Sequence, residues 1–147
     1  QAAVLLAKLE RFDWELERRA AIGARYERLL AGVPGVDRVV VRPDRNSVYA
    51  QYTVKVDERA AVQAALQAAG VPSAVHYPRP LHRQPAYAEY AGHAGGDPCP
   101  ASDREAARVL SLPMSADLTE ADQDRVVQAL AEAVRASTRA TTRAVAH

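Results

Sequence analysis

The chain has 147 residues, of which 48% are hydrophobic and 25% charged, with seven glycines and nine prolines. These ordinary globular values exclude a disordered chain, a collagen-like repeat and a coiled rod, and the length suits one domain or one lobe of a larger protein. The 19 Lys and Arg residues nearly balance the 18 Asp and Glu residues, and a formal net charge of +1 disfavours nucleic acid as a partner.

Cysteine content and hydropathy indicate the compartment. Cys99 is the only cysteine, which excludes an internal disulfide and a cysteine-based zinc site. The apolar run at residues 2–7 is far shorter than the roughly 20 residues that span a bilayer, and no basic region with a cleavage site marks a signal peptide. We therefore expect a cytoplasmic protein with no membrane partner.

The first 30 residues carry a helical apolar pattern. Apolar positions recur at a spacing of about 3.6 residues: Leu5, Leu9, Phe12, Leu16, Ala20, Gly23, Tyr26 and Leu30. This pattern predicts one long helix that ends at Gly32 and Pro34. No capping residue precedes the helix, so we expect the chain to be a piece of a longer polypeptide whose earlier residues cap and cover it.

The next segments predict strands around a helix. Residues 36–42 and 48–56 read as two antiparallel strands joined by a short turn at residues 43–46. Alternation in the second strand places five residues on one face: Val48, Ala50, Tyr52, Val54 and Val56. Asp57 is expected to cap a helix that Gly70 ends, and residues 73–77 return as a strand.

The second half begins with a proline-rich loop and ends with a helix. The loop contains a short turn at residues 84–90 and continues through residues 91–100. Ser102 with Glu105 is expected to cap a short helix, and residues 109–114 read as an edge strand. Thr119 with Asp122 is expected to cap the final helix, whose apolar side holds Val126, Val127, Leu130 and Val134. Residues 137–147 lack an apolar face and read as a frayed tail.

These elements predict the fold class and its divisions. We expect an α+β fold in which a small antiparallel sheet is covered by helices and preceded by the long helix. Residues 1–32 form the connecting helix, residues 33–136 the small domain, and residues 137–147 the tail.

One segment combines positive charge with stiff backbone. No acidic residue occurs between Glu58 and Glu89, although the interval holds five basic side chains: Arg59, His76, Arg79, His82 and Arg83. Such a segment suits an anionic ligand, because Arg matches carboxylates and phosphates and prolines reduce the entropy lost on closure. An equally simple reading is that these are solvated loop residues.

Other chemistries have weak support. His76 and His82 share no helical face and no Cys or nearby carboxylate completes a metal site, so zinc is disfavoured. No G-x-S-x-G turn or glycine-rich phosphate loop occurs. Lys8 and Lys55, the only lysines, lie off the apolar faces of their elements and read as solvated residues.

Five short segments, taken in order, resemble a known family. They are QAAVLLAKL at 1–9, SVYAQYTV at 47–54, GVPSAVHYPRPLH at 70–82, LSLPM at 110–114 and LTEADQ at 118–123. This series resembles the C-terminal part of the DegT/DnrJ/EryC1/StrS sugar aminotransferases. Within that family, the sequence around Tyr49 and His76 is most similar to enzymes that aminate UDP-2-acetamido-2-deoxy-3-oxoglucuronate.

The resemblance implies the small C-terminal domain of the aspartate aminotransferase (type I) fold. It implies a homodimer that uses pyridoxal phosphate, takes its amino group from glutamate and transfers it to a UDP-linked keto sugar. His76 and Tyr77 match the family's His-Tyr pair, which contacts the sugar nucleotide, commonly in the neighbouring subunit's active site. Arg79 replaces the apolar residue usual between the two prolines, so its role is open.

In this family the lysine that holds the cofactor lies upstream of the segment matched by residues 1–9. We therefore expect no catalytic, cofactor-binding or metal-binding residue in this chain, and no activity from it alone. The alternative is a non-catalytic α+β module that binds a small anionic ligand or mediates dimerisation.

Overall fold

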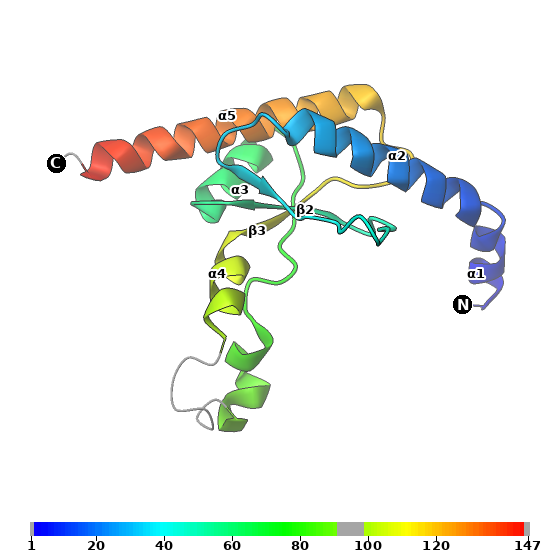
Figure 1. The fold of residues 1–147 in the computed structure, drawn as a ribbon, viewed down its shortest axis with the longest axis horizontal. Helices are drawn as coiled ribbons and strands as arrows, with labels where there is room; N and C mark the ends of the chain where they lie inside the picture. The colour runs from blue at the N-terminus through cyan, green and yellow to red at the C-terminus, as the bar shows by residue number, and fades with distance from the viewer. Residues whose placement is uncertain (1, 91–98, 146–147) are drawn as a thin grey trace.

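The computed structural model describes residues 2–90 and 99–145 (Figure 1). The helices are α1 (Ala2–Leu9), α2 (Phe12–Leu30), α3 (Arg59–Ala68), α4 (Pro100–Arg108) and α5 (Glu120–Val145). The strands are β1 (Val36–Arg38), β2 (Tyr52–Val56) and β3 (Val109–Leu112). Two 3₁₀ segments, Leu81–Arg83 and Pro85–Tyr90, follow α3 in the chain. No helix in the described part of the chain is both long and apolar enough to cross a membrane.

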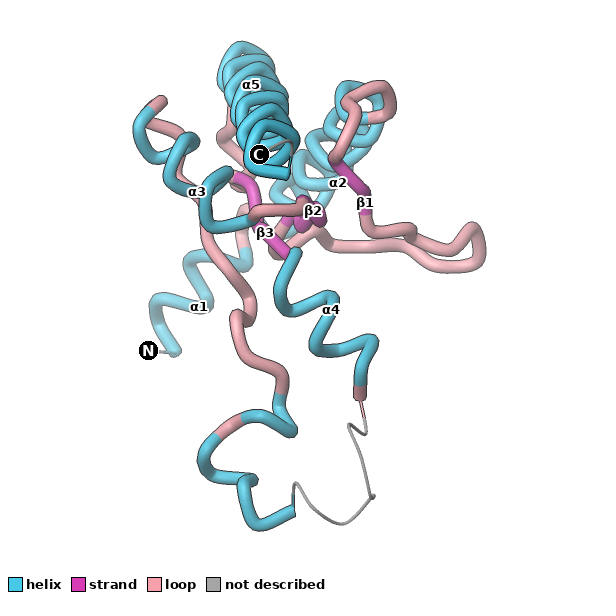
Figure 2. The backbone as a smooth tube through the Cα atoms, turned by 90° about the vertical axis from the view of Figure 1, so that its left-hand side faces the viewer, coloured by secondary structure: helices cyan, strands magenta, loops and turns pink. Residues whose placement is uncertain are grey.

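The strands form one antiparallel sheet with β2 at its centre. Val36 of β1 pairs with Val56, and Tyr52 at the other end of β2 pairs with Leu112 of β3. Helices α2, α3 and α5 lie on one side of the sheet, and α4 lies on the other (Figures 1 and 2). This arrangement confirms the predicted α+β class with its small helix-covered sheet.

The alternation of β2 separates the two faces of the sheet. Tyr52, Val54 and Val56 are buried and point toward α2, α3 and α5, whereas Thr53 and Lys55 point to the opposite face. The core is completed by buried residues from α2, β1, α3, β3 and α5 and by Val71 after α3: Ile22, Tyr26, Leu30, Val36, Val62, Leu66, Val71, Leu110, Leu112, Val126, Leu130, Ala133 and Val134. The helical face of the sheet is therefore the hydrophobic core.

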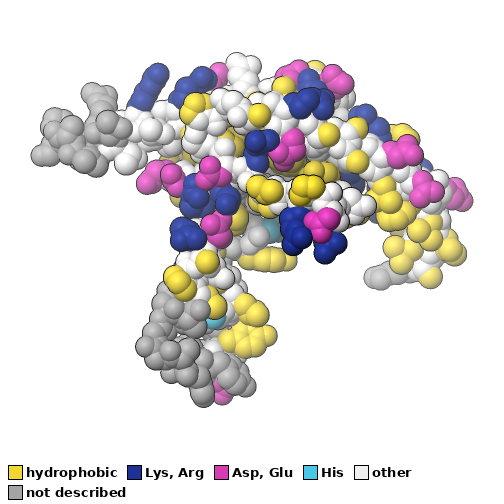
Figure 3. Space-filling model, viewed as in Figure 1, with side chains coloured by type: hydrophobic (Ala, Val, Ile, Leu, Met, Phe, Trp, Pro, Cys, Tyr) yellow, Lys and Arg dark blue, Asp and Glu magenta, His cyan; other side chains and the backbone are white. Residues whose placement is uncertain are grey.

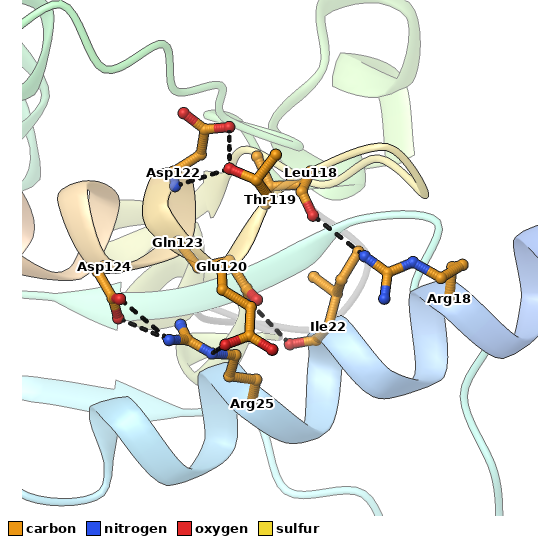
Figure 4. Close-up of polar contacts among 9 residues, drawn as sticks. All are labelled: Arg18, Ile22, Arg25, Leu118, Thr119, Glu120, Asp122, Gln123 and Asp124. Atoms are coloured by element: carbon orange, nitrogen blue, oxygen red, sulfur yellow. Dashed lines mark hydrogen bonds and ion pairs between the residues drawn. The ribbon is translucent and has the colours of Figure 1, made fainter.

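Polar contacts join α2 to the start of α5 (Figure 4). The Arg25 guanidinium donates to both carboxylate oxygens of Asp124 at 2.9 and 3.0 Å. The buried side chain of Gln123 donates to the backbone carbonyl of Ile22 at 3.0 Å. Arg18 donates to the Leu118 carbonyl at 3.4 Å. These contacts fix the position of α2 along α5, because each binds a defined backbone or carboxylate atom.

A hydrogen-bonded group at the edge of the core links α2 to the sheet. The Tyr52 hydroxyl donates to Glu27 Oε1 at 2.6 Å, and Arg38 donates to Glu27 Oε2 at 2.6 Å. Tyr26, whose ring lies 4.7 Å from that of Tyr52, donates its hydroxyl to the Pro113 carbonyl at 3.0 Å. Both buried tyrosine hydroxyls thus have acceptors.

We expect the protein to lose stability at alkaline pH through these tyrosines. Burial, and for Tyr52 the hydrogen bond to Glu27, raise the pKa of both hydroxyls above their ordinary value. The unfolded chain therefore loses these protons above about pH 10 while the folded chain keeps them, and the free energy of unfolding falls by about 1.4 kcal/mol per pH unit for each tyrosine. Urea titrations across this range should give a shallower slope for Tyr52→Phe; an unchanged slope contradicts the assignment.

A close approach between α2 and the chain before β2 requires a glycine. A Cβ atom built on Gly23 would lie 2.6 Å from Tyr49 Cε2. Tyr49 has φ of 45°, and its carbonyl accepts a hydrogen bond from Arg19 at 3.1 Å, so its backbone is held against α2. The absence of a side chain at position 23 is what allows this packing.

Gly23→Ala is therefore expected to lower the free energy of unfolding by about 1–3 kcal/mol, because the added methyl forces the Tyr49 ring away. Gly32→Ala is the matched control, since a Cβ atom added at this position would meet nothing within 4 Å and its φ is not positive. The control should change stability by no more than about 0.5 kcal/mol. Equal effects of the two substitutions in urea titrations would refute the packing argument.

The predicted single long helix is wrong, because the chain turns at Glu10 and Arg11 between α1 and α2. Arg11 lies 4.5 Å from the Trp14 ring and forms a 3.5 Å ion pair with Asp117, contacts that hold the turn. The apolar spacing continues through the turn, so periodicity alone could not show it. No residue of α1 is buried, and Figure 3 shows hydrophobic side chains gathered over it.

The predicted strands at 36–42 and 48–56 are longer than β1 and β2. Residues 39–51 leave the sheet as an excursion rather than a short turn, visible beyond β1 in Figure 2. Local contacts replace strand pairing there: Arg42 binds Asp44 at 3.0 and 3.1 Å, and the Ser47 hydroxyl accepts the Tyr49 N–H at 3.1 Å. The expected face is accordingly incomplete, because Val48 and Ala50 are exposed.

Two expected helix starts are also wrong. Asp57 does not cap α3; its carboxylate accepts a 2.8 Å hydrogen bond from Arg108, and Glu58 precedes the helix with φ of 50°. Helix α4 begins at Pro100 rather than at Ser102, because proline is suited to a first helical turn. By contrast, Thr119 caps α5 as predicted, accepting the Asp122 N–H at 3.1 Å.

The C-terminal segment differs from the predicted tail. Helix α5 continues to Val145. Ser137 and Thr138 both donate to the Val134 carbonyl at 3.0 Å, and Thr141 donates to the Ser137 carbonyl at 3.2 Å. These side chains bond back to their own helix, and the alanines and arginines between them favour helix, so the segment is helical without an apolar face.

Candidate functional site

A cavity of about 240 Å³ opens on the face of the sheet opposite the core. It lies where the chain after α3 crosses the edge strand β3. Its lining comes from three segments: Ala50 and Gln51 before β2; Pro72, Ser73, Ala74 and His76 after α3; and Ser111, Leu112, Pro113 and Met114 at the end of β3. Among the described residues, the lining contains neither Asp, Glu, Lys nor Arg.

The crossing segment is held to β3 by backbone hydrogen bonds. Ala74 donates to the Ser111 carbonyl at 3.1 Å and accepts the Ser111 N–H at 2.7 Å. This isolated bridge is all that forms of the strand predicted at 73–77. The bridge at Ala74 also positions His76, two residues further on, beside the cavity, because alternate residues of an extended segment point the same way.

His76 is tied down at one ring nitrogen and otherwise exposed. Its Nδ1 lies 3.1 Å from the Ser111 hydroxyl, and the residue as a whole is exposed. The Tyr77 ring stands perpendicular to the imidazole, with the ring centres 5.8 Å apart, and Tyr77 is 72% exposed. The two predicted site residues are therefore adjacent, but only His76 lines the cavity.

The other basic residues of the acid-free segment are used within the fold. His82 lies 3.2 Å from Asp103 of α4, and Arg83 pairs with the same carboxylate at 3.0 Å. Arg59 donates to the Ala106 carbonyl. These three side chains therefore have partners within the fold. Arg79 is exposed.

Sequence reasoning missed Ser111 and Thr53. Ser111 is 5% exposed, and its hydroxyl lies between His76 Nδ1 and the Thr53 hydroxyl, at 3.1 Å from each. The alternation of β2 and β3 could have placed both side chains on the sheet face away from the core. Nothing in the sequence showed that β3 pairs with β2 in a register that joins them.

The described residues show no metal or lysine chemistry. They contain no group of three or more His, Cys, Asp or Glu side chains placed to hold a metal ion. Lys55 forms a 3.3 Å ion pair with Glu105, and Lys8 is exposed on α1. Neither lysine lines the cavity that contains His76.

The chemistry of the cavity is that of a binding surface. Apolar walls surround a few polar hydrogen-bonding groups, from Gln51, Ser73 and His76, while the Ser111 hydroxyl in the lining faces His76 and Thr53. Such groups can orient the hydroxyl and carbonyl groups of an uncharged ring, and the exposed Tyr77 ring adds a flat surface for contact. Charged parts of a ligand would lie outside this lining.

Comparison with known proteins gives consistent similarities. The profile of the DegT/DnrJ/EryC1/StrS aminotransferase family matches residues 1–131. The chain is 47% identical over 114 residues to the UDP-2-acetamido-2-deoxy-3-oxo-D-glucuronate aminotransferase of Pseudomonas aeruginosa, covering 78% of this chain and 30% of that protein. It is 38% identical over 132 residues to the dTDP-3-amino-3,4,6-trideoxy-alpha-D-glucose transaminase of Streptomyces venezuelae, covering 90% of this chain and 34% of that protein.

Solved structures give the same result. The fold matches that of DesV from S. venezuelae, solved with a ketimine intermediate, with a TM-score of 0.81 and 38% identity over 90% of this chain and 35% of that one. A DegT/DnrJ/EryC1/StrS aminotransferase from Brucella abortus matches with a TM-score of 0.79 and 41% identity over 88% of this chain and 34% of that one. The chain spans about a third of the length of the curated relatives it matches. Sequence, fold and the order of the motifs agree that this chain belongs to the DegT/DnrJ/EryC1/StrS aminotransferase family.

Proposed function

We propose that this chain is the C-terminal portion of a pyridoxal-phosphate-dependent sugar-nucleotide aminotransferase. The complete enzyme moves the amino group of glutamate to a UDP-linked keto sugar of the 3-oxo uronate type, and glutamate becomes 2-oxoglutarate. The observation that carries this proposal is the 47% identity to the Pseudomonas enzyme, whose name specifies that substrate.

Within that enzyme, His76 and Tyr77 bind the sugar nucleotide. The imidazole presents its free edge, and the tyrosine ring lies exposed beside it. Hydrogen bonds from such groups orient a sugar ring relative to the reacting carbonyl. The residues act by binding and orientation, because the one hydroxyl beside His76, that of Ser111, belongs to a 5% exposed side chain and is shared with Thr53.

The cofactor does not fit the residues present here. Lys55 is paired with Glu105, Lys8 lies on a helix with no buried residue, and neither lines the cavity beside His76. The lysine that holds pyridoxal phosphate therefore belongs to a part of the complete enzyme outside this chain. The complete enzyme is proposed to be a homodimer, in which this part of one subunit supplies His76 and Tyr77 to a sugar-nucleotide site.

The proposal is tested with the complete enzyme and two acceptors. Glutamate is supplied together with UDP-2-acetamido-2-deoxy-3-oxoglucuronate or with a dTDP-linked 3-keto-6-deoxy sugar, and amine formation is followed by mass spectrometry. We expect a higher kcat/KM for the UDP-linked uronate. Faster turnover of the dTDP sugar would refute the substrate assignment, and no amine from either acceptor would refute the aminotransferase itself.

The isolated 147-residue chain should neither hold the cofactor covalently nor transfer an amino group. Incubation with pyridoxal phosphate followed by borohydride reduction and peptide mass spectrometry should leave Lys8 and Lys55 unmodified beyond the level of the unfolded chain. The unfolded chain serves as the control for nonspecific reaction with amines. Selective labelling of either lysine, together with turnover, would contradict the prediction.

A further inference from the structure

Ser111 is a buried polar side chain on the non-core face of the sheet. It is 5% exposed, and Gln123 is the other buried polar residue among those that the structure describes. The Gln123 amide has a clear packing role, because it binds the Ile22 carbonyl between two helices. The Ser111 hydroxyl instead faces the exposed side chain of His76, so burial of this group is coupled to a surface residue.

Three hydrogen-bonding atoms form a line across the sheet. Thr53 Oγ1 lies 3.1 Å from Ser111 Oγ, which lies 3.1 Å from His76 Nδ1. Thr53 and Ser111 are direct cross-strand partners, so their side chains are held close by the sheet itself. Each hydroxyl can donate one hydrogen bond and accept another, so both contacts can form whether His76 Nδ1 donates or accepts.

The same serine also fixes the backbone that carries the histidine. Both backbone groups of Ser111 bind Ala74, two residues before His76. The imidazole is thus held at its backbone and at Nδ1, which leaves Nε2 as the ring nitrogen that can meet a ligand. A side chain restricted in this way loses little rotational freedom when the ligand binds.

We infer that Ser111 is a positioning residue of the sugar-nucleotide site, which holds the His76 imidazole by Nδ1 and turns Nε2 toward the substrate, with Thr53 holding Ser111 in turn. This inference rests on the proposed function, since it assumes that His76 contacts the sugar nucleotide. It adds to that function a supporting pair on β2 and β3, whose members act on substrate only through the histidine.

The test is a double-mutant cycle in the complete enzyme. Ser111→Ala is expected to raise the KM for the sugar nucleotide roughly three- to tenfold, the cost of one side chain left unrestrained. The rate of the half-reaction with glutamate should not change. In the His76→Ala background, Ser111→Ala should have no further effect, because its only route to the substrate is then absent.

Thr53→Val provides a second route in case Ser111→Ala does not fold. It leaves the Ser111 hydroxyl in place, and we expect a smaller rise in the same KM, again absent in the His76→Ala background. Ser137→Ala is the matched control: this half-buried serine on α5 donates to the Val134 carbonyl and lies on the other side of the core from His76. Its KM should stay within about twofold of the wild type.

The outcomes separate the inference from the function on which it rests. An unchanged sugar KM in Ser111→Ala and Thr53→Val, or an equal rise with and without His76, overturns the positioning role while the function stands. An unchanged sugar KM in His76→Ala overturns the substrate contact, and with it the inference. A rise that depends on His76 supports both.

Discussion

Replacing His76 with alanine in the complete enzyme is expected to raise the KM for the sugar nucleotide about tenfold or more. On the proposed function the exposed imidazole, held at Nδ1 and with no partner at Nε2 among the described residues, binds the substrate through a hydrogen bond that the alanine variant loses. The half-reaction with glutamate should proceed at its normal rate, because the smaller amino donor does not need this contact. Single-turnover kinetics of the two half-reactions would measure the difference.

His82→Ala is the matched control for that experiment. His82 lies six residues further along the same segment, but its ring faces the Asp103 carboxylate of α4 at 3.2 Å. We expect its removal to leave the sugar KM within about twofold. Equal damage to both half-reactions by His76→Ala, or an equal rise in sugar KM for the two histidine variants, would refute a specific role for His76.

Leu66→Ala is expected to lower the free energy of unfolding by about 2–5 kcal/mol. Leu66 lies on α3, is fully buried, and belongs to the core cluster that joins α3 to α5 and to the sheet. Truncation leaves a cavity that rigid neighbours on both sides cannot fill. Urea unfolding followed by far-ultraviolet circular dichroism would measure the loss.

Leu81→Ala is the corresponding control, because the same atoms are removed from a side chain that is 70% exposed. Its effect should stay within about 0.5 kcal/mol. A loss for Leu66→Ala no larger than that of the control would mean that α3 does not pack as described.

The elements best predicted from the sequence are those whose signals are local. Thr119 with Asp122 indicated the start of α5, and Gly70, which has φ of 70°, indicated the end of α3. Polar and apolar alternation indicated the buried face of β2 from Tyr52 to Val56. Each of these features depends on residues that lie a few positions apart in the chain, so the sequence shows the interacting residues together.

Elements that depend on distant partners could not be predicted. Asp57 had the sequence of a helix cap, but Arg108, 51 residues away, binds its carboxylate. Residues 39–42 and 48–51 were predicted to continue the two strands, but nothing in the described chain pairs with them as a ladder. At the turn between α1 and α2, Arg11 forms an ion pair with Asp117, which lies far along the chain.

Some residues of the site were likewise predictable from the sequence, whereas others became visible only in the structure. Tyr77 came only from the resemblance to a family, which also singled out His76 among the basic residues of the acid-free segment. The charge argument left an anion-binding segment and solvated loop residues equally open, and the structure pairs Arg83 of that segment with Asp103. Alternation could place Ser111 on the non-core face of its strand, but its contact with Thr53 comes from the register of β2 with β3, which the sequence did not show.

That register also has a consequence for how the protein is made. Tyr52 pairs with Leu112, so the central strand leaves the ribosome 60 residues before its second neighbour. At a synthesis rate of about 5–20 residues per second, one edge of β2 stays unpaired for roughly 3–12 s before β3 is made. An unpaired apolar strand is a template for wrong pairing, and the charged side chain of Lys55 within β2 opposes it.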